Sequence, residues 1–281
     1  MSTSTLQERT YSCPAGDIHY WISHPEQARA DRPPLVFCHG MTADHHLFDA
    51  QLSHFAAEHI LLAWDAPAHG LSRPWRSFSY DAAAECLYAI MQQEQLSKAL
   101  LIGQSMGAYI TQVFAIKHSD SVLAMVCVDS TPLGHAYYSR SVRRLLPHVS
   151  SLAAAYPTRL LRYAIAKNAT FTPSSYQYMH HTLQQLSKAE ICRLMKVCYS
   201  DFLRYEKTAQ FDFPLLLVMG QHDKTGLVKK YMYDWAWQAD LSMAVLPDAA
   251  HNSNADNPDA FNEVLTRFLC DLAAPPNLSF I

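Results

Sequence analysis

The stretch "LLIGQSMGAYI", residues 100–110, sets one serine between two glycines in a chain that has only eight glycines. A short apolar run precedes Ser105, as in a buried strand, and residues that can form a helix follow it. A strand-to-helix turn this sharp brings positions 103 and 107 so close to neighbouring backbone that a Cβ would clash, which explains both glycines. The pattern predicts a strained turn that exposes a hydroxyl at the N-terminus of a helix.

A serine hydroxyl is a poor nucleophile unless a base takes its proton. His251 lies in the polar loop "VLPDAAHNSNADNP", after the last apolar run and before the last helical pattern, and it is the only histidine after Asp223. This position predicts that His251 is the base for Ser105.

The base in turn needs an acid that fixes its tautomer and stabilises its charged form. Asp223 follows the apolar run "LLLVMG" by three residues and is the favoured candidate. Asp129, at the end of "LAMVCVD", is the rival, since some serine hydrolases place the acid after that strand. The alternative for Asp129 is a strand-end cap, and His222 is interpreted as a surface residue.

Backbone donors are needed for the oxyanion of a tetrahedral intermediate. The N–H of Met106, directly after the serine, is one expected donor, and the N–H of Met41 in "FCHGMTADHHLF" is the other. Thr42 is a weaker candidate. The side chains of Met41 and Met106 are also expected to wall the pocket.

The remaining sequence alternates apolar runs with helical patterns. Strands are expected at 18–22, 34–40, 60–65, 98–104, 122–129, 213–220 and 241–247, with a turn at 16–17 before the first. Helices are expected at 47–59, 81–96, 105–118, 227–238 and 258–272, and an extended tail at 273–281. Continuous apolar strands separated by helices predict an α/β fold with a mostly parallel, doubly wound sheet.

Residues 133–208 interrupt this alternation with a strand-poor, helical stretch. It is expected to form a helical insertion in a core made of residues 1–132 and 209–281. Residues 133–200 carry nine Arg or Lys and one acid, a net charge of +8, against −11 for the rest of the chain.

Five motifs in this order resemble those of the α/β-hydrolase-fold serine hydrolases with a helical lid. They are "HGM" at 39–41, "DAPAHGLS" at 65–72, "GQSMG" at 103–107, "GQHD" at 220–223 and the His251 loop. That group includes small esterases, lactonases, carbon–carbon bond hydrolases and cofactor-free haloperoxidases. The resemblance implies an α/β-hydrolase fold with a nucleophile elbow, a catalytic triad of Ser105, Asp223 and His251, and an oxyanion hole. It also implies that residues 133–208 form the lid over the active site, and it implies neither a metal nor an organic cofactor.

Three departures from the family pattern bear on function. Ala68 stands where the family often has glycine. The nucleophile is Ser and not Asp, which argues against relatives of the epoxide hydrolases and haloalkane dehalogenases. Asn252 follows His251, and the lysine that plant hydroxynitrile lyases carry near that point is absent.

The leading interpretation is a carboxylesterase-like enzyme that hydrolyses a small ester, thioester or lactone through an acyl-enzyme on Ser105. The alternative enzyme is a hydrolase of a carbon–carbon bond in a diketone-like acid. A ligand receptor on the same fold is a third hypothesis, although such proteins often lose part of the site, and here every part is present.

The basic lid raises a hypothesis about the substrate. One or two of its arginines could face the cleft and bind a substrate carboxylate. Its aromatic residues, such as Tyr137 and Tyr138, suit an apolar acyl or aryl pocket, and the alternative is that they pack the lid helices against each other. The candidate arginines are Arg140, Arg143, Arg144, Arg159 and Arg162. A solvated face is the simpler alternative, and contact with an anionic membrane surface is another.

Composition limits the remaining classes. The chain has 281 residues, 49% apolar and 17% charged, with a net charge of −3, so nothing points to nucleic acid. It shows neither an expected secretory signal nor an apolar run long enough to span a bilayer, and its histidine pairs suggest no metal site. The seven scattered cysteines are expected to be free thiols, which are typical of a cytoplasmic protein. The protein is expected to be a monomer or a homodimer.

Overall fold

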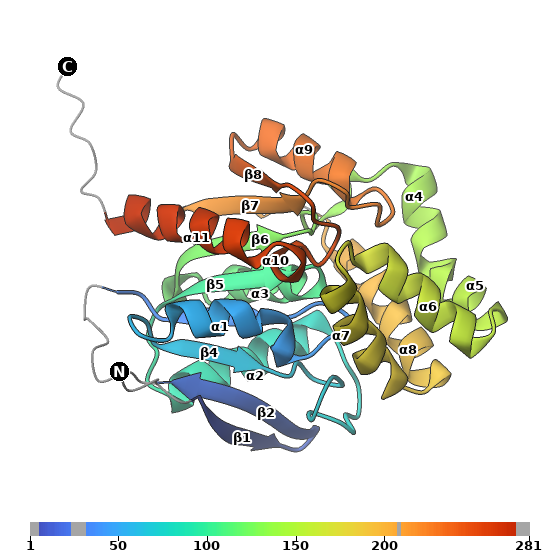
Figure 1. Cartoon of the computed structure of the whole chain (residues 1–281), viewed down its shortest axis with the longest axis horizontal. Coiled ribbons are helices and arrows are strands. Elements are labelled where there is room, and N and C mark those ends of the chain that lie inside the picture. The colour runs from blue at the N-terminus through green and yellow to red at the C-terminus, as the bar shows by residue number, and fades with distance from the viewer. Residues whose placement is uncertain (1–5, 24–31, 207–208, 274–281) are drawn as a thin grey trace.

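The computed structural model describes residues 6–23, 32–206 and 209–273. Its centre is an eight-stranded sheet in the order β1-β2-β4-β3-β5-β6-β7-β8 (Figure 1). The strands are β1 (Gln7–Cys13), β2 (Gly16–Ser23), β3 (Leu35–Cys38), β4 (Leu61–Trp64), β5 (Ala99–Gln104), β6 (Val122–Val128), β7 (Leu215–Gly220) and β8 (Ser242–Leu246). β1 and β2 are antiparallel to their neighbours and the other pairs are parallel. The predicted α/β fold with a mostly parallel sheet is confirmed.

Helices cover both faces of the sheet, and an apolar cluster fills each interface. One face carries α1 (Asp49–Phe55), preceded by η1 (His45–Phe48), and α10 (Ser253–Asp256) with α11 (Pro258–Ala273). The other carries α2 (Tyr80–Gln93), α3 (Met106–Lys117), followed by η2 (Ser119–Ser121), and α9 (Val228–Gln238). Parallel strands buried on both sides explain why β3 to β7 are continuously apolar.

The N-terminal hairpin differs from the prediction. Cys13 pairs with Gly16 across a two-residue turn at Pro14-Ala15, so the turn expected at 16–17 is wrong and lies two residues earlier. β1 itself was not expected, because its sequence "QERTYSC" has no apolar face and its residues are exposed or half-buried. An edge strand that pairs with one neighbour and is largely exposed need not show a periodic pattern of apolar residues in the sequence.

Between β6 and β7 the chain forms a layer of short helices beside the carboxyl ends of the strands (Figure 1). These inserted helices are η3 (His135–Tyr137), α4 (Arg140–Leu145), η4 (Leu146–His148), α5 (Val149–Ala155), α6 (Thr158–Ala169), α7 (Pro173–Gln184), α8 (Lys188–Cys198) and η5 (Asp201–Arg204). They share an apolar cluster of their own, which includes Leu161, Leu183 and Ile191. Position 208, the expected end of the insertion, and the tail after 273 lie outside the described residues.

In the part of the chain that the structure describes, no helix has the length and apolar character needed to cross a membrane.

Candidate active site

Ser105 occupies the turn between β5 and α3 with φ 50° and ψ −112°, a conformation that L-residues rarely adopt. A Cβ on Gly103 would lie 2.5 Å from the Ala108 Cα, and one on Gly107 would lie 1.9 Å from the Cys38 carbonyl oxygen. The predicted steric reason for both glycines is therefore confirmed. The Ser105 N–H donates to the Val128 carbonyl (2.8 Å), which ties the turn to β6.

A chain of hydrogen bonds joins Ser105, His251 and Asp223. His251 Nε2 lies 2.8 Å from Ser105 Oγ, and His251 Nδ1 lies 2.9 Å from Asp223 Oδ2. An ionised carboxylate only accepts, so Nδ1 carries the proton and Nε2 is left to accept the serine hydroxyl. The three residues follow β5, β7 and β8, whose carboxyl ends meet at one edge of the sheet.

The ion pair between Asp223 and His251 shifts the pKa values of both residues. Burial disfavours the imidazolium, but the Asp223 charge and hydrogen bond outweigh it, so the pKa of His251 lies above its ordinary value. Burial would raise the pKa of Asp223, but the His251 charge and hydrogen bond lower it, and the Thr225 N–H adds a donor at 2.7 Å from Oδ1. Asp223 is thus held as a carboxylate, suited to stabilise a charged histidine.

Asp129, the rival acid, has different partners. Its Oδ1 accepts from the Gly220 N–H (2.7 Å), and its Oδ2 accepts from the Ser253 N–H (3.1 Å) and contacts the Ser253 hydroxyl. It is fully buried, and burial together with the Asp223 charge raises the pKa of Asp129 well above its ordinary value. Asp129 therefore links the end of β7 to the start of α10, while Asp223 pairs with the histidine ring.

The two expected oxyanion donors border the same space as Ser105. Met41 and Met106 both line the cavity at the serine. Among the residues that the structure describes, neither the Met41 nor the Met106 backbone N–H donates to a protein acceptor. Thr42 adopts a left-handed φ of 64°, and its hydroxyl donates to the Met41 carbonyl (2.6 Å), so the turn is held with that carbonyl engaged.

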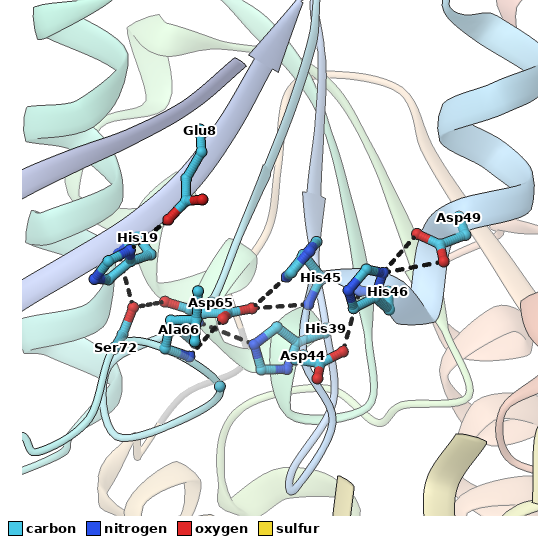
Figure 2. A network of polar contacts seen from close by, with 12 residues as sticks. Glu8, His19, His39, Asp44, His45, His46, Asp49, Asp65, Ala66 and Ser72 are labelled. Carbon is cyan, nitrogen blue, oxygen red and sulfur yellow. Dashed lines mark hydrogen bonds and ion pairs between the residues drawn. The ribbon is translucent and has the colours of Figure 1, made fainter. Parts of the chain in front are cut away.

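Polar contacts between the loops after β3 and β4 fix the Met41 turn (Figure 2). His39 Nδ1 donates to the Gly40 carbonyl (2.8 Å), and His39 Nε2 accepts from the Ala66 N–H (2.9 Å). Asp65 accepts from the His45 N–H (2.9 Å) and from His45 Nδ1 (2.8 Å). The motifs "HGM" and "DAPAHGLS" thus build one scaffold behind the turn.

The charge states of this scaffold follow from burial and hydrogen bonding. Burial lowers the pKa of His39, which stays neutral and can donate at one nitrogen while it accepts at the other. Burial would raise the pKa of Asp65, but hydrogen bonds from His45 and the Leu71 N–H (2.7 Å) leave it below its ordinary value. A neutral histidine and an ionised aspartate therefore hold the two loops together.

Three residues that position the site were not expected from the sequence. Gln104 Nε2 donates to the His251 carbonyl (2.6 Å), Ser130 Oγ donates to the Ser105 carbonyl (2.9 Å), and Thr225 holds Asp223 as described. Gln104 occupies one of the two variable positions of the serine motif, and its place beside Ser105 was the one available signal. Nothing in the sequence distinguishes Ser130 or Thr225 from other polar loop residues.

A cavity of about 470 Å³ opens at Ser105, within the usual range for small-molecule sites. Its walls come from the core (Met41, Tyr80, Tyr109, Tyr231) and from the inserted helices (Tyr138, Leu146, Ile165, Phe202), among others. Most of this surface is apolar, and it is aromatic on one side.

The expected substrate-binding residues of the insertion do not border this cavity. Among the described residues, its lining includes none of Arg140, Arg143, Arg144, Arg159, Arg162 and Tyr137. Three of the arginines are exposed, and the half-buried Arg162 donates to the Leu186 carbonyl (2.5 Å), between helices. The structure therefore does not bring these residues to the cavity, where apolar side chains of the inserted helices stand instead.

The histidine pairs bind neighbouring carboxylates or other side chains. Within the described ranges, no group of three or more His, Cys, Asp or Glu side chains is placed to hold a metal ion. His45 binds Asp65, and His46 binds Asp49 (3.1 Å).

Comparison with known proteins yields consistent matches. A family model described as alpha/beta hydrolase fold matches residues 33–191. The 3-oxoadipate enol-lactonase 2 of Acinetobacter baylyi is 21% identical over 87% of this chain and 91% of its own length. The esterase YbfF of Escherichia coli is 23% identical over 87% and 96%. The solved structure of a thermophilic esterase from Thermogutta terrifontis covers 96% of this chain and 100% of its own, at 17% identity and a TM-score of 0.76.

Proposed function

Because the chain belongs to the alpha/beta hydrolase fold family, we propose that it hydrolyses a small carboxylic ester, thioester or lactone through an acyl-enzyme on Ser105. It is an enzyme of the α/β-hydrolase type, as its named relatives are. The observation that carries the proposal is the hydrogen-bond chain from Ser105 through His251 to Asp223, with distances of 2.8 and 2.9 Å.

In the proposed reaction His251 takes the proton of Ser105 as the serine oxygen attacks the carbonyl carbon. The Met41 and Met106 N–H groups stabilise the oxyanion, since neither donates to an acceptor within the described residues. His251 then protonates the leaving alcohol, thiol or ring oxygen. Water activated by His251 attacks the acyl-enzyme and releases the acid.

We assign the inserted helices, within residues 133–208, as a lid over this site. Contacts between the segments support the assignment. The Asn252 N–H donates to the Ala169 carbonyl (2.8 Å), and Asp256 accepts from the Phe171 N–H (2.9 Å) and the Thr172 N–H (3.0 Å). The loop that carries His251 is therefore bonded directly to the junction of α6 and α7.

Ester and lactone substrates are favoured over a diketone-like acid. The relatives' names include an esterase and an enol-lactonase. Cleavage of a carbon–carbon bond in an acid would need a cation for the carboxylate, and among the described residues the cavity lining holds no Lys or Arg. A receptor without activity is disfavoured because the complete hydrogen-bond chain and both free donors are retained.

Labelling with a fluorophosphonate tests the proposal. The wild-type chain is expected to become labelled on Ser105 and to hydrolyse 4-nitrophenyl acetate, whereas Ser105→Ala should do neither. At high enzyme concentration, a burst of nitrophenol equal to the enzyme would report the acyl-enzyme.

Ser151→Ala provides the matched control, since Ser151 is an exposed serine on α5. It should label and turn over as the wild type does. Hydrolysis by Ser105→Ala at the wild-type rate, with both variants folded, would exclude the serine mechanism.

A further inference from the structure

Five aromatic rings form a continuous wall along one side of the cavity. In order they are Tyr80, Tyr109, Phe202, Tyr138 and Tyr231, and successive ring centroids lie 5.4, 4.9, 5.1 and 4.6 Å apart. All five line the cavity at Ser105. These spacings are those of aromatic rings in favourable contact.

The aromatic wall is assembled from both parts of the fold. α2, α3 and α9 of the core supply Tyr80, Tyr109 and Tyr231, and the two ends of the insertion supply Tyr138 and Phe202. Four of the five side chains belong to buried residues. The wall is therefore a preformed surface, fixed by packing on several elements.

The phenol groups of the wall are mostly engaged by protein. The Tyr80 hydroxyl donates to the Cys198 carbonyl (3.1 Å), the Tyr138 hydroxyl donates to the Pro132 carbonyl (2.7 Å), and the Tyr109 hydroxyl contacts Thr131 Oγ1. Burial raises the pKa of Tyr109 to about 12, so this phenol stays neutral near pH 7. The Tyr80 ring is fully buried and supports the wall from behind. The other four rings offer ring carbons, and the hydroxyls of Tyr109 and Tyr138 are already satisfied.

Charge is nearly absent from the surroundings of the wall. Among the residues that the structure describes, the cavity lining has no Lys, Arg or Glu, and its Asp and His are Asp129 and His251. Asp129 is bonded to Gly220 and Ser253, and His251 to Asp223 and Ser105. A charged group on the substrate would find no counter-ion here and would lose its hydration.

Three of the rings and the loop of His251 belong to elements on different faces of the sheet. α2, α3 and α9, which carry three of the rings, cover one face of the sheet, whereas the loop of His251 continues into α10 and α11 on the other (Figure 1). The leaving group receives its proton from His251 and so lies on the His251 side. The acyl chain needs a separate part of the cavity, and the five rings supply an apolar one.

Resting on the proposed function, we propose that the aromatic wall is the acyl subsite and that it selects an uncharged, apolar acyl group, with an aryl ring as the best fit. Such a preference would distinguish this enzyme from a hydrolase of acidic substrates. It also explains why a basic insertion presents no cation to the site.

A series of 4-nitrophenyl esters tests the proposal, with each kcat/KM divided by the rate of hydrolysis by hydroxide. Burial of a phenyl ring should favour the 3-phenylpropanoate over the acetate by at least about tenfold. The succinate monoanion should fall below its neutral isostere, the 4-methylpentanoate, by about a hundredfold or more. Equal rates within either pair would overturn the assignment.

A cation is the other occupant that aromatic rings can bind. The 4-(trimethylammonio)butanoate is therefore compared with the isosteric 5,5-dimethylhexanoate. The uncharged ester should be faster, and a faster cationic ester would replace an apolar acyl subsite with a cation-binding one.

Two substitutions tie the preference to the wall. Tyr231→Leu and Phe202→Leu keep an apolar side chain but remove a ring, and each should lower the phenylpropanoate-to-acetate ratio by about fivefold. Tyr233→Leu is the control, because Tyr233 lies on the same helix but is 47% exposed and outside the cavity. An unchanged ratio in both wall variants would contradict the proposal.

Fluorophosphonate labelling distinguishes failure of the acyl subsite from failure of the serine hydrolase function. Labelling of Ser105 with no acyl preference leaves the serine hydrolase in place and rejects the subsite. Absence of both labelling and hydrolysis rejects the function and the subsite together. The comparison of wild-type rates decides the question even where a wall variant does not fold.

Discussion

Two carboxylates lie close to His251, and their hydrogen bonds give them different tasks. Asp223 Oδ2 accepts from the His251 ring, whereas Asp129 accepts from the Gly220 and Ser253 N–H groups. Removing the first charge should harm catalysis, because the imidazolium loses its partner and the wrong tautomer becomes accessible. Replacing Asp129 should mainly loosen the end of β7 and the start of α10, because its hydrogen bonds join them.

We predict that Asp223→Asn lowers kcat by roughly 10³- to 10⁴-fold. Asp129→Asn should lower kcat less than about tenfold and reduce the free energy of unfolding by about 1–3 kcal/mol, the cost of a disturbed buried hydrogen bond. Steady-state kinetics and urea unfolding measure the two effects. An equal loss of kcat in both variants, with both folded, would show that Asp129 shares the role of the acid.

The raised pKa of His251 predicts the acid limb of the pH profile. His251 must be neutral to accept the Ser105 proton, so kcat/KM should fall as pH drops through a midpoint above the ordinary histidine value of 6.5. Asp223→Asn removes the negative charge that favours the imidazolium, so the midpoint should move to lower pH. Glu263→Gln, at an exposed ion pair with Arg267 on α11, should leave it in place. A midpoint that is unmoved in Asp223→Asn would contradict this assignment.

The sequence was sufficient to predict the nucleophile, but it predicted the acid partner of the triad less firmly. The glycines around Ser105 have a steric cause that can be read directly, as the 2.5 and 1.9 Å contacts of an added Cβ show. Asp129 and Asp223 could not be separated with the same strength, because both follow apolar strands. Their difference lies in the direction of each side chain, which depends on the path of two loops.

The turn after β4 carries an uncommon conformation at Ala68, whose φ is 68°. The left-handed region costs a non-glycine residue roughly 1–2 kcal/mol of folding free energy. Glycine avoids this strain, but its greater conformational entropy in the unfolded chain cancels part of the gain in stability. We predict that Ala68→Gly raises the free energy of unfolding by about 0.5–1 kcal/mol. Urea unfolding measures it.

Ala89→Gly serves as the opposite control for that turn. Ala89 lies inside α2, where glycine should lower the free energy of unfolding by about 1 kcal/mol. A loss of stability in both variants would mean that the Ala68 methyl group contributes packing that outweighs the backbone strain.

Elements with an apolar period were predictable, and those held by their neighbours were not. β3 to β8 and α2, α3, α9 and α11 follow the expected pattern within a few residues. β1 is a polar edge strand, and the four-residue helix α10 begins two residues after His251. Aromatic residues of the insertion, Tyr138 among them, were expected to suit an apolar acyl or aryl pocket. The aromatic wall itself could not be predicted, since its rings come from five separate segments and meet only in three dimensions.

Charge is divided unevenly over the folded chain, and the division bears on how substrates reach the site. Residues 133–200 carry +8 and the rest −11, yet within the described residues no Lys or Arg lines the cavity. Exposed charges act over about 10 Å at 0.1 M salt, and they steer only charged molecules. The basic surface should therefore have little effect on kcat/KM for an uncharged ester.

We predict that kcat/KM for a neutral ester changes less than about twofold between roughly 10 mM and 0.5 M salt. The triple variant Arg140→Ala, Arg144→Ala, Arg159→Ala removes three exposed arginines of the inserted helices and should also stay within about twofold, because none of them borders the cavity. Steady-state rates at each ionic strength, with thermal unfolding as the check on folding, measure both. A drop in kcat/KM of tenfold or more in the folded triple variant would indicate that one of these arginines binds the substrate. A steep dependence of kcat/KM on salt would indicate that the basic surface takes part in binding.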